Sequence, residues 1–203
     1  AALRSLTRLP ETAGELRRVA ALLGAGEADL YLGADATEAA VKSADLSRTR
    51  VLSFATHGVV AGSFEAVGQP GLVLTPPIAA TPQDDGLLTA GEVALLRLNA
   101  EAVILSACNT AAPDGTPGAE GLSGLAKAFL YAGAKSMLVS HWPVDSAATV
   151  TLMTGVFEAR ESDPEIGLAE ALRRARLSMI DNGDRPALAH PFYWSPFVLV
   201  GEG

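Results

Sequence analysis

The chain has 203 residues, of which 49% are hydrophobic and 19% are charged, a composition that indicates a folded domain and excludes the disordered class. The 15 basic and 23 acidic residues give a net charge of -8. Negatively charged nucleic-acid phosphates and anionic lipids would be repelled by this charge, so we expect neither as a direct partner. The single Cys excludes an intramolecular disulfide, and no stretch resembles a transmembrane span or a signal peptide. We therefore expect a soluble cytoplasmic protein.

Apolar residues alternate between helical and strand-like spacing along the chain. A first helix is predicted at residues 10–23 and a second after Thr37, with a short apolar strand at residues 30–32 between them. Further strands are predicted at 51–55, 71–75, 102–106, 136–140 and 197–200. Further helices are predicted at 89–96, 122–130, 146–160 and 166–180.

Short strands that alternate with helices predict an α/β sandwich around a mainly parallel sheet. Two loops rich in Pro, Gly and Asp interrupt this pattern, at residues 76–86 and 109–120. The second loop directly follows a predicted buried strand, where long loops are often functional. In sheets of this kind the functional side chains lie beyond the carboxyl ends of the strands.

Two of the predicted strands lead to residues that support nucleophilic catalysis. Residues 51–55 lead to His57, and residues 102–106 lead to Cys108. Parallel strands end at the same edge, so we expect the imidazole to lie within reach of the thiol. The imidazole would take the thiol proton, whose free pKa is ~8.5, and return it to a leaving amine. The backbone N–H groups of Gly58 and Cys108 are candidates for holding the oxyanion.

Each of these residues also has an ordinary structural explanation. Cys108 follows an apolar strand and fits a buried core thiol, while His57 alone fits a hydrogen-bonded histidine at a strand end. Their order, their spacing and the adjacent Gly58 together favour catalysis. His141 and His190 show no zinc-binding spacing with this pair, so no metal is predicted. No phosphate-binding glycine motif is present either, so no cofactor is expected.

Four strings carry a family resemblance: VLSFATHG (51–58), AVILSACNTA (102–111), GLSGLAKAFLYAGAKSMLVSHWPV (121–144) and YWSPFVLVGE (193–202). Together they resemble the CHAT family of caspase-like cysteine peptidases over most of the chain. The resemblance implies a caspase-like three-layer α/β/α sandwich and a His57 and Cys108 dyad. It also implies an upstream tetratricopeptide-repeat or similar region. We accordingly interpret residues 1–15 as a linker or remnant of that region and residues 16–203 as the peptidase domain.

The resemblance also implies which residues lie near a bound peptide. The family lines its substrate cleft with the loop after the strand at 136–140, which here contains His141 and Trp142. Caspase relatives that cleave after Arg or Lys often carry an acidic residue just before the nucleophile. The corresponding residue here is Ser106, so a preference for basic residues is not predicted. Asp145, in a nearby loop, is a candidate for supplying a negative charge instead.

These features predict a caspase-like cysteine endopeptidase that hydrolyses peptide bonds in protein substrates without a cofactor. An upstream region or an activating partner would restrain it. One alternative is a non-catalytic peptide-binding scaffold with the same fold, which an ordinary, unreactive Cys108 would favour. Another is a small-molecule amidase with the same dyad, which the dependence of turnover on peptide length would separate from a peptidase.

Overall fold

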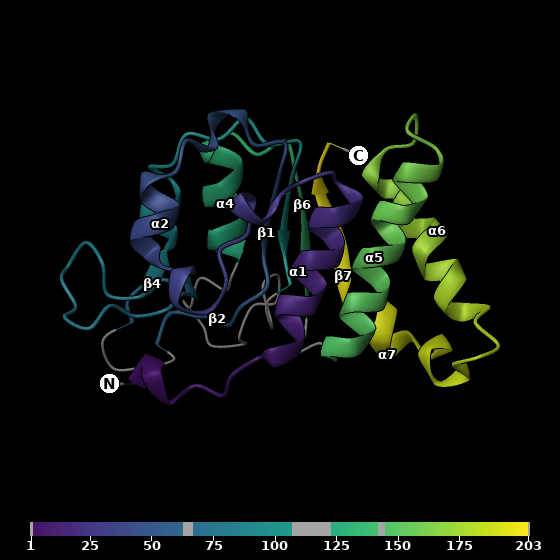
Figure 1. Cartoon of the computed structure of the whole chain (residues 1–203), viewed down its shortest axis with the longest axis horizontal. Helices are drawn as coiled ribbons and strands as arrows, with labels where there is room; N and C mark the ends of the chain where they lie inside the picture. Colours follow the sequence, from purple (N-terminus) through teal and green to yellow (C-terminus); the bar gives the residue numbers. More distant parts are fainter. Residues whose placement is uncertain (1, 63–66, 107–122, 142–144, 203) are drawn as a thin grey trace.

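The computed structural model describes residues 2–62, 67–106, 123–141 and 145–202 (Figure 1). Its central sheet has four strands in the order β1-β5-β6-β7. These strands are β1 (Val51–Phe54), β5 (Ala102–Leu105), β6 (Ser136–Ser140) and β7 (Phe197–Gly201). β1, β5 and β6 are parallel, and β7 is antiparallel to β6. Every residue of β5 and β6 is buried, as expected for parallel strands covered on both faces.

Helices cover both faces of this sheet, as Figure 1 shows. One face carries α2 (Glu38–Ser43), α3 (Ala90–Val93) and α4 (Ser123–Ala132). The other face carries α1 (Pro10–Leu22) and α5 (Ser146–Ser162), with α6 (Leu168–Ile180) packed on α5. The predicted three-layer α/β/α sandwich with a mainly parallel sheet is therefore confirmed.

Apolar stripes on the helices make the two cores between these layers. Leu125 and Phe129 lie one turn apart on α4, and both are fully buried. The ring of Phe129 meets that of Phe54 with 5.6 Å between centroids. On the opposite side, Val19 of α1 and Phe157 of α5 belong to the core that includes β5 and β6 residues. The core thus holds α1 and α5 against the same face of the sheet.

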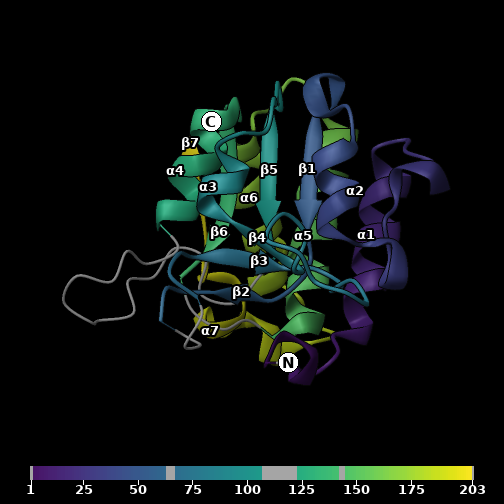
Figure 2. The same cartoon turned by 90° about the vertical axis from the view of Figure 1, so that its left-hand side faces the viewer.

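A second, smaller sheet contains three antiparallel strands in the order β2-β3-β4. They are β2 (Gly58–Val59), β3 (Gly71–Val73) and β4 (Leu87–Thr89). Figure 2 shows this sheet beyond the carboxyl ends of β1 and β5. The strand predicted at residues 71–75 exists as β3, but it belongs to this sheet.

The strand predicted at residues 30–32 was wrong. This segment lies between two short 3-10 turns, and Tyr31 is 49% exposed. Three apolar residues without neighbouring strands to pair with do not form a ladder, so the local pattern had no tertiary support.

The predicted loop at 76–86 is anchored at its end by a buried carboxylate. Glu38 is 1% exposed, and its Oε2 accepts hydrogen bonds from the N–H groups of Asp85 at 2.9 Å and Gly86 at 3.0 Å. Lys42, one turn later on α2, pairs with Glu38 and also donates to Glu92 Oε1 at 2.7 Å. The buried charge is thereby paired and hydrogen-bonded, which offsets the cost of taking it out of water.

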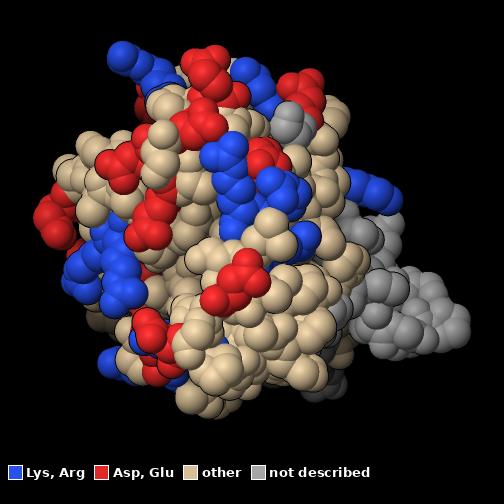
Figure 3. Space-filling model, turned by 90° about the vertical axis from the view of Figure 1, so that its right-hand side faces the viewer, with Lys and Arg blue, Asp and Glu red and all other residues tan. Residues whose placement is uncertain are grey.

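The face that carries α6 mixes charges of both signs (Figure 3). Glu170 Oε2 accepts from Arg173 at 2.6 Å, and its Oε1 accepts from Arg174 at 2.8 Å. These hydrogen bonds lower the pKa of Glu170 to about 2. Arg174 also reaches Asp163 at 3.0 Å. Within the described ranges, no helix combines the length and apolar character needed to cross a bilayer.

We predict that Gly133→Ala destabilises the fold more than Gly24→Ala. Both glycines have positive φ, +112° and +67°, but a Cβ on Gly133 would lie 2.2 Å from the carbonyl oxygen of Leu98, whereas nothing lies within 4 Å at Gly24. Backbone strain alone costs roughly 1–2 kcal/mol, and the clash adds roughly 1–3 kcal/mol at Gly133. Urea unfolding of the two variants measures the difference, and equal losses would contradict the role of the close approach.

Candidate active site

The carboxyl ends of β1 and β5 lie side by side. Phe54 is in register with Leu105, and the pairing continues beyond the strands because the N–H of Ser106 donates to the carbonyl oxygen of Phe54 at 2.9 Å. His57 follows Phe54 by three residues and directly precedes β2 of the small sheet. The sheet therefore brings the two segments that the sequence singled out to one edge, where α/β proteins bind ligands.

Backbone groups on two sides hold His57. Its carbonyl oxygen accepts from the N–H of Val73 at 2.8 Å, which ties it to β3. Its ring Nε2 lies 2.7 Å from the carbonyl oxygen of Thr7, in the segment before α1. A carbonyl oxygen only accepts hydrogen bonds, so this contact assigns the proton of the neutral ring to Nε2. The other nitrogen, Nδ1, is then the basic one.

Ser106 also has a side-chain partner that comes from α1. Its Oγ donates to Oε1 of Glu15 at 2.6 Å, and the exposed fractions of the two residues are 7% and 2%. In the described part of the chain, no Lys, Arg or His forms a salt bridge with Glu15. Burial raises the pKa of Glu15 to about 7, while the Ser106 hydrogen bond acts in the opposite direction.

His141 and Asp145 flank the carboxyl end of β6. The backbone N–H of His141 donates to the carbonyl oxygen of Pro196 at 2.9 Å. His141 borders a hollow of about 290 Å³, which apolar side chains of α4, β6 and β7 line for the most part. Asp145 is the N-cap of α5, and its Oδ1 accepts from the N–H of Ala148 at 2.8 Å. Substrate contact by either residue stays a prediction.

The predicted nucleophile and part of the predicted cleft lie outside the described residues. These are Cys108, Trp142 and the loop at 109–120. Gly58 is described, as the first residue of β2, where it pairs with Leu72. Its part in an oxyanion hole stays a prediction.

Two residues of this edge were not expected from the sequence, Thr7 and Glu15. Thr7 acts through its backbone, which no side-chain motif can reveal. Glu15 did leave a signal, since it lies one helical turn before Val19 and hence on the buried face of α1. A carboxyl group on the apolar face of an amphipathic helix indicates either a partner or a function.

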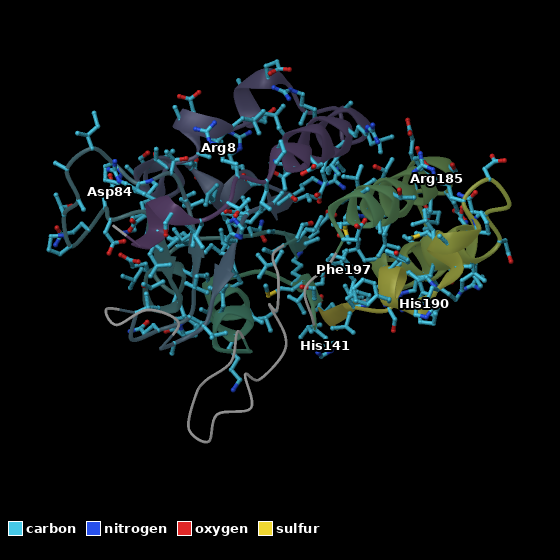
Figure 4. All side chains as sticks on the ribbon, turned by 90° about the horizontal axis from the view of Figure 1, so that it is seen from below. Arg8, Asp84, His141, Arg185, His190 and Phe197 are labelled. Atoms are coloured by element: carbon cyan, nitrogen blue, oxygen red, sulfur yellow. The ribbon has the colours of Figure 1, made fainter. Side chains whose placement is uncertain are left out.

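The described ranges contain no group of three His, Cys, Asp or Glu side chains suited to a metal ion. His190 lies among the C-terminal elements, away from His141 (Figure 4), and its Nδ1 accepts from the N–H of Phe192 at 3.2 Å. It thereby caps the short helix α7 (Pro191–Trp194).

The burial of Glu15 leads to a prediction about stability and pH. Because the folded-state pKa is about 7 and the ordinary value is 4.5, the folded chain keeps a proton between these pH values that the unfolded chain has lost. The associated stability is present below pH 4.5 and is lost as the pH rises to about 7. The free energy of unfolding of Glu15→Gln, compared with that of wild type, should therefore increase by up to ~3 kcal/mol as the pH rises from about 4 to about 8.

Urea unfolding across this pH range measures the difference between the two free energies of unfolding. The matched control is Glu11→Gln, an exposed carboxyl on the same helix. A difference between wild type and Glu15→Gln that does not change with pH would contradict the prediction.

Comparison with known proteins assigns the family. The CHAT domain family model matches residues 2–202. Tetratricopeptide repeat protein 28 of Mus musculus is 30% identical over 226 residues, covering 96% of this chain and 9% of that protein. Its Homo sapiens counterpart is 29% identical over 226 residues, covering 96% of this chain and 8% of that protein. The chain thus spans less than a tenth of these curated relatives, and it belongs to the CHAT domain family.

Proposed function

We propose that this chain is a cysteine endopeptidase that acts through His57 and Cys108. The observation that carries the proposal is the adjacency of the β1 and β5 ends, since one leads to His57 and the other reaches Cys108 two residues after Ser106. Membership of the CHAT domain family supports the same reading, because the family is caspase-like.

The proposed reaction begins with proton transfer from the Cys108 thiol to Nδ1 of His57. The thiolate adds to the peptide carbonyl carbon, and the carbonyl electrons move to oxygen, where the N–H groups of Gly58 and Cys108 hold the oxyanion. Collapse breaks the C–N bond, and the imidazolium gives its proton to the leaving amine. A water molecule then adds to the thioester, losing its proton to Nδ1, and collapse breaks the C–S bond to release the carboxyl product. The departing thiolate takes that proton back.

Thr7 has a defined part in this scheme. By accepting from Nε2–H, its carbonyl oxygen keeps Nδ1 free for the thiol proton and stabilises the imidazolium that forms. The hydrogen bond of the His57 carbonyl with Val73 fixes the backbone beneath the ring. A base held at both its ring and its backbone loses little freedom when it reacts.

We further propose that the substrate is a protein or an extended peptide. It would lie along this edge near Ser106, His141, Trp142 and Asp145, with its backbone paired to a strand edge. No cofactor or metal takes part in the proposed chemistry.

Control would come from an upstream tetratricopeptide-repeat region or an activating partner, an idea supported by the names of the two relatives. Contacts of the N-terminal segment support this idea. Leu3 and Leu6 pack against the small sheet, and Thr7 reaches the ring of His57. Full-rate cleavage of a broad peptide panel by the 203-residue chain alone would contradict this part of the proposal.

The lone cysteine makes the dyad directly testable. We predict that iodoacetamide alkylates Cys108 rapidly even at a pH well below ~8.5, the pKa of a free thiol. The substitution His57→Ala should slow this alkylation about tenfold or more at about pH 7. Hydrolysis of a mixed peptide library should fall roughly 10²–10⁴-fold in His57→Ala, where general base catalysis is lost, and should vanish in Cys108→Ala.

Intact mass follows the alkylation, and mass spectrometry of the library follows the cleavage. His190→Asn is the matched control, because it removes another imidazole while keeping a side chain that caps helices well. The proposal would be contradicted if Cys108 were alkylated with the pH dependence of an ordinary thiol, if His57→Ala did not change that dependence, and if no peptide were cleaved. These results would favour a peptide-binding scaffold. Cleavage confined to small amides, whatever their length, would favour an amidase.

A further inference from the structure

Glu15 is a buried carboxyl group at the edge of the sheet where the proposed chemistry takes place. It is 2% exposed and lies on the face of α1 that turns toward the sheet, one helical turn before the core residue Val19. Burying a carboxyl group is costly unless partners offset the loss of water, and its hydrogen-bond partner in the described chain is the hydroxyl of Ser106. A hydrophobic residue at this position would pack at lower cost, so the carboxyl group calls for a reason beyond stability.

Ser106 is held from two sides. Its backbone N–H donates to Phe54 of β1 at 2.9 Å, and its Oγ donates to Glu15 of α1 at 2.6 Å. It is the residue after the end of β5, and Cys108 follows it by two positions in the sequence. The backbone bond sets the register of Ser106 on β1, and the side-chain bond sets its position relative to the helix layer.

The same N-terminal stretch also contacts the other strand end. Thr7 bonds to His57, and Glu15 bonds to Ser106, so residues 7–15 contact both segments that the dyad uses. Figure 2 shows the N-terminus on the side of the sheet toward which β1 and β5 run. α1 is therefore attached to this edge by two polar contacts as well as by its apolar face.

We propose that Glu15 is a positioning residue that acts through Ser106 to hold the end of β5, and with it the start of the segment that leads to Cys108. This inference rests on the proposed function for its catalytic readout. Glu15 does not touch the reacting atoms in this scheme; it fixes the strand end from which the nucleophile segment departs.

The charge of Glu15 matters for the direction of the hydrogen bond. An ionised carboxylate only accepts, so the Ser106 hydroxyl must donate toward α1, and such a charge-assisted bond is stronger than a neutral one. A protonated carboxyl group can donate instead, which frees the hydroxyl to turn. We therefore expect the Ser106 hydroxyl to be oriented toward α1 more strictly above the pKa of Glu15, which is about 7, than below it.

Other charged groups around α1 do not replace Glu15 in this role. β1 and β5 carry no titratable residue, and those of α5 are Glu158, Arg160 and Glu161, in its last turns. Arg160 lies 3.9 Å from Glu101, just before β5 and hence at the opposite end of the sheet from Ser106. The Asp145 carboxylate is engaged in capping α5, and the His57 ring is bonded to Thr7. On α1 itself, Glu11, Arg17 and Arg18 are exposed.

A double-mutant cycle in the 203-residue chain tests the inference. The variants are Glu15→Gln, Ser106→Ala and the double variant, with Glu11→Gln as the matched control on the exposed face of α1. Two readouts are measured across pH: the rate of Cys108 alkylation by iodoacetamide, from intact mass, and kcat and KM for a library-derived peptide.

We expect Glu15→Gln and Ser106→Ala each to lower kcat and the alkylation rate about tenfold at about pH 8, with KM nearly unchanged. Below about pH 6, Glu15 of the wild type is itself neutral, so the decrease of kcat and of the alkylation rate in Glu15→Gln relative to wild type should become smaller. The double variant should lose no more than either single variant, because both remove one hydrogen bond. Glu11→Gln should stay within about twofold of wild type, within the scatter of surface substitutions.

Stability separates positioning from a merely structural role. Glu15→Gln is predicted above to be more stable than wild type at about pH 8, so a slower Cys108 in a more stable protein cannot arise from unfolding. If Glu15→Gln does not fold, Ser106→Ala alone still tests the bond, and a Cys108 that reacts there as in wild type overturns the inference.

Three further outcomes would overturn it: rates in Glu15→Gln equal to those of Glu11→Gln at every pH, losses that add fully in the double variant, or an altered preference for basic peptides with unchanged alkylation. The last result would make Glu15 a substrate-recognition residue. If the wild type cleaves no peptide, the proposed function fails, while the alkylation cycle still decides whether Glu15 positions the strand end.

Discussion

Backbone hydrogen bonds between β1 and β5 continue past the strands to Ser106, and the geometry of the candidate site follows from that pairing. Parallel pairing places both carboxyl ends at one edge, so His57 and the segment leading to Cys108 leave the sheet together although 51 positions separate them in the sequence. The helices on both faces keep β5 fully buried, which makes any shift in its register costly. The small antiparallel sheet then fixes the backbone of His57 through Val73.

The N-terminal segment combines an ordinary core contact with polar contacts at this edge. α1 contributes Val19 to the core, an ordinary apolar contact, and one turn earlier places Glu15 where a hydrophobic side chain would be less costly. The neighbouring Thr7 bonds to His57, so a single stretch of chain contacts both strand ends. The structure thus places the carboxyl group of Glu15 directly on Ser106, although the two residues belong to different elements.

The strongly patterned elements were predictable, and two short strands of the small sheet were not. The helices α1, α4, α5 and α6 and the strands of the central sheet carry enough apolar residues at one period to be identified alone. The strands Gly58–Val59 and Leu87–Thr89 are too short to show alternation, and they exist because Gly71–Val73 pairs with both. The apolar residues 30–32 show the converse, since they lack a partner strand and form no ladder.

The sequence by itself determined the α/β class and the family resemblance and singled out the two residues of the predicted dyad, because periodicity, local motifs and their order are properties of the chain alone. Tertiary structure decided which groups meet those segments. Thr7 contacts His57 through a backbone carbonyl, which every residue possesses, and Glu15 contacts Ser106 across 91 positions in the sequence. Such contacts depend on how α1 packs against the sheet, and that packing is set by the burial of apolar surface summed over both cores, which no local pattern encodes.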